Sequence, residues 1–86
     1  MKLVTAMLKL DEIIAADKKS KVYLKMRTPI IGKFLRLSDY DEKINKGWVR
    51  FVSEGNMWLW ETSHKEHVTR LFKVEDIIEI KDYENA

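Results

Sequence analysis

The chain has 86 residues, a formal net charge of +2 and no cysteine. This length allows one small domain, and the lack of cysteine excludes disulfide bonds and thiolate metal sites. Hydrophobic residues make up 45% of the chain, which favours a folded core over intrinsic disorder.

The first expected element is an N-terminal helix over residues 1–17. The apolar stripe of an amphipathic helix is formed at spacings of four, three and four by Leu3, Met7, Leu10 and Ile14. A second interpretation stays open: Lys2–Leu10 forms a strand, and Asp11 caps a shorter helix that ends at Ala16.

The rest of the chain predicts short antiparallel strands. Val22, Leu24 and Met26 alternate strictly with polar or charged neighbours, which is the period of a half-buried strand. The expected strands are Lys21–Arg27, Ile30–Leu37, Trp48–Val52, Met57–Glu61, Val68–Val74 and Ile77–Ile80. A polar loop is expected over Ser38–Gly47, a single helical turn at Glu75 and Asp76, and a frayed tail over residues 81–86.

These elements predict a mainly β, α+β fold in one domain over residues 1–86. The N-terminal helix is followed, over residues 21–80, by a five- to six-stranded antiparallel, strongly bent small β-barrel. Short strands in a small chain curl because curling removes exposed sheet edges.

A resemblance supports this architecture. The segment Ile31-Gly32-Lys33-Phe34-Leu35, with the later Asp39 and Ile44-Asn45, resembles the second-to-third-strand signature of Sm-like domains. A helix before a bent five-stranded sheet is similar to the same fold, and the resemblance covers roughly residues 21–48. It implies an SH3-like or Sm-like small barrel, and no nucleotide-contacting residue is transferred from it.

Charge is distributed unevenly along the chain. Residues 18–50, here called the basic block, hold ten basic and three acidic residues, a local charge of +7, whereas the flanking segments carry −1 and −4. A basic block suits an anionic partner. A second interpretation is that the block pairs, within one molecule or across a dimer, with the acidic tail, defined as Glu75, Asp76, Glu79, Asp82 and Glu84.

Strand alternation places part of the basic block on one sheet face. If Val22 and Val49 face the core, their basic and aromatic neighbours point outward. The second strand is ambiguous, because an inward Leu35 also puts Lys33 inside unless Gly32 marks a bulge, in which case Phe34 points outward. The candidate nucleic-acid-binding residues are Lys21, Tyr23, Lys25, Arg27, Phe34, Arg36, Trp48 and Arg50.

Such a face suits RNA or single-stranded DNA, because cations follow the phosphates while bases stack on aromatic rings. The alternative is an ordinary solvated sheet face whose aromatic residues are covered by the helix or by a partner. Trp58 and Trp60 are expected on one side of their strand, as core residues or as the interface of a homo-oligomer. A protein-interaction or self-assembly domain is therefore the alternative function.

Catalysis is not expected. His64 and His67, with Glu61 nearby, lack the third convergent ligand that a zinc site needs, and the acidic loop at Asp39 and Asp41 lacks the pattern of a calcium loop. The serines fall in expected turns without a glycine elbow, and no glycine-rich phosphate loop is present. The sequence predicts a non-enzymatic protein without metal or cofactor.

The expected location is the cytoplasm, without membrane association. The first ten residues are interrupted by Lys9 and followed by Asp11, unlike the apolar core of a signal peptide. No apolar run approaches the length of a membrane span.

Overall fold

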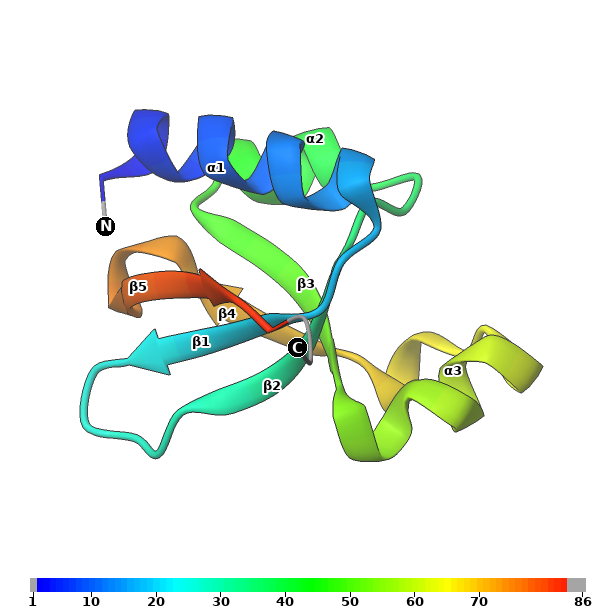
Figure 1. Ribbon diagram of the computed structural model, residues 1–86. Helices are drawn as coiled ribbons and strands as arrows, with labels where there is room; N and C mark the ends of the chain where they lie inside the picture. The colour runs from blue at the N-terminus through cyan, green and yellow to red at the C-terminus, as the bar shows by residue number, and fades with distance from the viewer. Residues whose placement is uncertain (1, 84–86) are drawn as a thin grey trace.

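A computed structural model describes residues 2–83, in which two helices lie on one side of a sheet and a third extends from its end (Figure 1). The helices are α1 (Leu3–Ala16), α2 (Tyr40–Asn45) and α3 (Met57–Ser63). The strands are β1 (Ser20–Leu24), β2 (Ile30–Leu35), β3 (Trp48–Ser53), β4 (Arg70–Lys73) and β5 (Ile77–Asp82). Short 3-10 turns are η1 (Glu54–Asn56), η2 (Glu66–Val68) and η3 (Val74–Asp76).

The five strands form one antiparallel sheet in the order β4-β3-β2-β1-β5. β4 and β5 follow one another in the chain but occupy opposite edges, so the sheet is not closed into a barrel. The predicted N-terminal helix and five-stranded antiparallel sheet are confirmed, and the predicted barrel closure is not.

The core lies between α1 and the sheet. Ala6, Leu10 and Ile13 recur at spacings of four and three and are buried, which confirms the predicted helix and excludes the alternative strand over Lys2–Leu10. Three phenylalanines from neighbouring strands pack against one another in this core: the ring centroids of Phe34 and Phe51 are 5.0 Å apart in an edge-to-face arrangement, and those of Phe51 and Phe72 are 5.1 Å apart.

Strand register defines two sheet faces. The inner face, which contacts the core, includes the directly opposed pairs Phe34–Phe51 and Val49–Phe72. The outer face points away from the core and includes the opposed pairs Lys33–Val52, Leu35–Arg50 and Trp48–Lys73. β2 pairs with β3 in continuous register from Gly32 to Leu35, so the alternation runs through Gly32, with Phe34 inward and Lys33 outward.

Two predicted elements are wrong. Met57–Glu61 belongs to helix α3 instead of a strand, and the predicted loop Ser38–Gly47 contains helix α2. β3 already pairs with β2 on one side and β4 on the other, so a strand after η1 would have no free edge of β3 to join. Hydroxyl groups of Thr62 and Ser63 donate hydrogen bonds to the carbonyls of Trp58 (3.0 Å) and Leu59 (2.7 Å) one turn earlier in α3. At the end of the helix, the amide of the left-handed His64 donates to the carbonyl of Trp60 at 2.8 Å.

The predicted single turn at Glu75 and Asp76 is confirmed as part of η3. The tail was expected to fray from Lys81, yet Lys81 and Asp82 belong to β5 and pair with β1. Tyr83 follows β5, and residues 84–86 of that predicted tail lie outside the described residues.

Candidate functional site

Three of the eight predicted binding residues are not available on the outer face. Phe34 lies in the core with 4% of its surface exposed, so its expected outward orientation is wrong. That expectation depended on a bulge at Gly32, which the continuous β2–β3 register excludes.

Arg50 points to the outer face but is buried, with 9% exposed. Its Nη2 atom forms an ion pair with Oδ2 of Asp39 at 2.9 Å, and its Nη1 atom donates a hydrogen bond to Oγ1 of Thr69 at 2.9 Å. Arg50 therefore connects β3 to the loop before α2 and to the segment before β4, and its expected exposure is wrong.

Arg36 follows β2 and contacts the helices. Its Nη2 atom lies 2.7 Å from Oδ1 of Asp11 on α1, and its guanidinium lies 4.5 Å from the ring centroid of Tyr40 on α2. Burial is the main cause that raises the pKa of the Tyr40 phenol above its usual value. Arg36 thus belongs to the junction of α1 and α2 rather than to a shared sheet face.

Half of the cations in the basic block are held in ion pairs. The pairs are Lys19–Glu54, Lys33–Asp17, Arg36–Asp11, Lys46–Glu42 and Arg50–Asp39. Within residues 2–83 no acidic-tail residue pairs with the block, and Glu84 of that tail lies outside the described residues. Lys21, Lys25 and Arg27, all predicted binding residues, have no ion-pair partner in the same range.

Two adjoining hollows flank the half-buried Trp48 at the start of β3. Their volumes are about 640 Å³ and 200 Å³, and both are lined by Trp48 and Lys73. We call their combined surface the Trp48 groove. Its charged residues are Lys2, Lys25, Arg27, Lys46, Lys73, Glu75 and Asp76.

Backbone hydrogen bonds to η3 build this groove. The amide of Val74 donates to the carbonyl of Gly47 at 2.8 Å, and the amide of Lys25 donates to the carbonyl of Asp76 at 3.0 Å. The turn before β3 and the turn after β1 are thereby held at the two ends of η3, Val74 and Asp76. Gly47 has φ +86°, a left-handed conformation that glycine adopts without a side-chain clash.

The groove combines excess positive charge with an aromatic surface. Five basic and two acidic residues line it, and Nζ of Lys73 lies 5.6 Å from the ring centroid of Trp48. Lys73 is directly opposite Trp48 in the β3–β4 ladder. Such an arrangement can hold an anion beside a flat, apolar ring.

The sequence predicted Lys25, Arg27 and Trp48, and the structure brings these three together. Sequence reasoning missed Lys2, Lys46 and Lys73. Alternation along β4 places Lys73 on the outer face. Its position beside Trp48 depends on the β3–β4 register, which no local sequence pattern reveals. Lys21 and Tyr23 lie elsewhere, on the outer face of the β1–β5 ladder.

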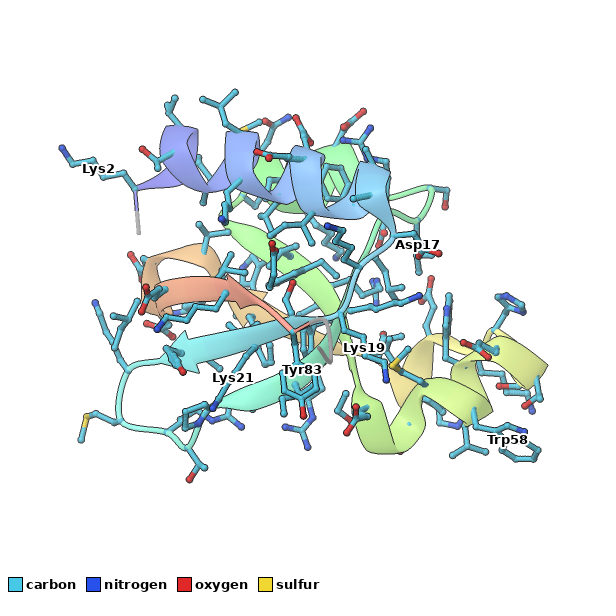
Figure 2. All side chains as sticks on the ribbon, in the orientation of Figure 1. Lys2, Asp17, Lys19, Lys21, Trp58 and Tyr83 are labelled. Carbon is cyan, nitrogen blue, oxygen red and sulfur yellow. The ribbon has the colours of Figure 1, made fainter. Side chains whose placement is uncertain are left out.

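The two tryptophans of α3 point in different directions. Trp60 is half-buried and lines a hollow of about 220 Å³ together with Val52 and Met57. Trp58 is 70% exposed and points away from the sheet at the end of the molecule opposite Lys2 (Figure 2). Their expected position on one side is wrong, because residues two apart share a face in a strand but not in a helix.

In residues 2–83 no three or more His, Cys, Asp or Glu side chains come together in a group that could bind a metal. None of the helices in that range is both long enough and apolar enough to cross a membrane. Comparison with protein-family models, curated proteins and solved structures finds no match to this chain.

Proposed function

We propose that this protein is a non-enzymatic module that binds single-stranded nucleic acid in the Trp48 groove. The observation that carries the proposal is the half-buried Trp48 ring among five basic side chains, four of which have no ion-pair partner within residues 2–83. Cations follow the phosphates while a base stacks on the ring, which contributes about 1–3 kcal/mol per base.

Single strands fit this groove better than duplexes because a base must leave its own stack to reach the Trp48 ring. The fold retains the helix and the five-stranded antiparallel sheet that the Sm-like resemblance implies.

Trp48→Leu is expected to weaken binding of a fluorescent single-stranded oligonucleotide of about 10 nucleotides by about tenfold, because the stacking surface is lost. Lys73→Gln is expected to weaken binding and to reduce the slope of log affinity against log salt by about 0.7, the value for one phosphate contact. Fluorescence anisotropy titrations of RNA and DNA oligonucleotides at several salt concentrations measure both effects.

Lys65→Gln is the matched control, because it removes the same charge from the exposed loop after α3, away from Lys2 (Figures 1 and 2). It should leave affinity almost unchanged. Wild-type protein that binds no oligonucleotide at low salt, or that binds with no salt dependence, would exclude the proposed function.

We propose self-association through α3 as the second function. The supporting observation is a pair of adjacent exposed apolar side chains, Trp58 at 70% and Leu59 at 44%, on a short helix that extends from the sheet (Figure 1). Exposed aromatic residues of this size are typical anchors of protein interfaces.

Trp58→Ser is expected to shift a concentration-dependent oligomer to monomer, since truncation of a buried interface tryptophan usually costs about 2 kcal/mol or more. Sedimentation velocity over a wide concentration range measures the change. Val4→Ser is the control, because Val4 on α1 is equally exposed at 73% and lies outside α3. A wild-type chain that stays monomeric at high concentration would rule out self-association.

A further inference from the structure

A second basic and aromatic surface lies on the outer face of the β1–β5 ladder. Lys21 is directly opposite Lys81, and Tyr23 is directly opposite Glu79. The amide of Tyr83 donates a hydrogen bond to the carbonyl of Lys19 at 3.0 Å, which places Tyr83 in the next row (Figure 2). We call Lys21, Lys81, Tyr23 and Tyr83 the tyrosine–lysine patch.

The two lysines of this patch lie over the same aromatic ring and form no ion pair within residues 2–83. Their Nζ atoms lie 5.5 Å and 5.6 Å from the centroid of the same ring, that of Tyr23. Neither lysine has an ion-pair partner within residues 2–83, and Glu79 beside them forms none either. Like charges directly opposite in a sheet are unfavourable, so an anion between them would relieve the repulsion.

The geometry of the lysine pair suits a single phosphate group. Cβ atoms of directly opposed residues are about 5 Å apart, so both flexible side chains can reach one phosphate from the same side. Of the two rings beside the pair, Tyr83 is 38% exposed and Tyr23 is half-buried. Cations between aromatic rings are the elements of a single-strand binding surface.

The patch lies close to the Trp48 groove at the end of β1. Lys25 is in the turn that follows β1, two residues after Tyr23, so the chain between them spans at most about 7 Å. Lys25 also lines the smaller hollow beside Trp48. A single strand that leaves the groove at Lys25 therefore reaches the patch next.

We infer that the tyrosine–lysine patch is a second subsite for the same nucleic-acid strand. Lys21 and Lys81 hold one backbone phosphate, and the rings of Tyr23 and Tyr83 stack with the adjoining bases. This inference rests on the proposed function and adds to it a footprint that extends beyond the groove. The predicted consequence is that a strand long enough to cover both surfaces binds more tightly than a short one.

The test is the double variant Lys21→Gln/Lys81→Gln, compared with Lys18→Gln/Lys65→Gln. The control removes the same charge from exposed lysines that have no ion pair in residues 2–83 and lie outside both surfaces. Anisotropy titrations use labelled single strands of about 4 and about 12 nucleotides. The test variant should lose about tenfold in affinity for the longer strand and little for the shorter one, and its salt slope for the longer strand should fall by about 0.7.

If the longer strand binds and the test variant keeps both its affinity and its salt slope, the second subsite is wrong while the proposed function stands. If no strand binds the wild-type protein, both are wrong. Titration of inorganic phosphate and cosedimentation with phosphatidylserine vesicles identify other sources of the anion. Loss of either interaction in the test variant, with oligonucleotide binding unchanged, overturns the inference in favour of a free anion or a membrane surface.

Discussion

Gly32→Ala is expected to destabilise the fold by about 3 kcal/mol, near the upper end of the cost of overpacking. A Cβ atom at Gly32 would lie 2.0 Å from the carbonyl oxygen of Val52 and 2.7 Å from Cζ of Phe51. The nearest atom belongs to the backbone of the paired strand, so a side-chain rotation cannot relieve the clash. Urea denaturation followed by circular dichroism measures the loss.

Gly55→Ala is the matched control for this substitution. A Cβ atom at Gly55 meets nothing within 4 Å, and the change is expected to stay within about 0.5 kcal/mol. If Gly32→Ala unfolds at the same urea concentration as Gly55→Ala, the close approach of β3 to Gly32 is wrong.

Asp39→Asn is expected to cost about 2 kcal/mol, because it leaves the guanidinium of the buried Arg50 without its counter-charge. The side chains of Arg50 and Asp39 are 10% and 28% exposed, so the effect should be smaller than for a fully buried pair. The same denaturation experiment measures it.

The exposed Asp41, which forms no ion pair in the described part of the chain, provides the control. Asp41→Asn should change stability by about 0.5 kcal/mol or less. The double variant Asp39→Leu/Arg50→Met should recover most of the loss, since apolar replacement of both partners is often neutral. Equal stability of Asp39→Asn and Asp41→Asn would show that the Arg50 ion pair contributes little.

Apolar residues spaced three and four apart correctly indicated helix in this chain. The spacing of four and three at Leu3, Met7 and Leu10 predicted α1. The buried residues of α1 are Ala6, Leu10 and Ile13, so Leu10 is buried as expected, and Ala6 is buried in place of the neighbouring Met7. The sequence also held a signal for α2, because the apolar Tyr40 and Ile44 are four residues apart and the acidic Asp41 precedes Ile44. In the structure both Tyr40 and Ile44 are buried.

The error at α3 has a different origin. Met57–Glu61 begins with four consecutive apolar residues, so it shows no alternation of apolar and polar positions. An apolar run of this length does not distinguish a strand from a helix. The decisive fact is non-local, because both edges of β3 are already occupied. At the end of the helix, the left-handed His64 donates its amide hydrogen to the carbonyl of Trp60. The error changed the predicted interface, because helix geometry separates Trp58 from Trp60.

Five of the eight predicted binding residues lie on the outer surface. Lys25, Arg27 and Trp48 meet in one groove, and Lys21 and Tyr23 lie on the adjoining ladder. Phe34 was misplaced because the prediction put Leu35 in the core, and adjacent residues of a strand point to opposite faces, whereas Leu35 is paired with the outward Arg50. Arg50 was oriented correctly but buried by Asp39 and Thr69, residues that are distant in sequence from it.

The sequence by itself determined the N-terminal helix, the antiparallel β content and the basic block of residues 18–50, because each depends on the order of neighbouring residues. Tertiary structure alone decided which cations are neutralised, since the partners of Lys19, Lys33 and Arg36 lie at least 16 residues away in the chain. It also decided where the unpaired cations meet, because strand register and the hydrogen bonds to η3 bring Lys73, Lys25 and Trp48 together. Such pairings depend on the packing of the whole domain, which no local pattern encodes.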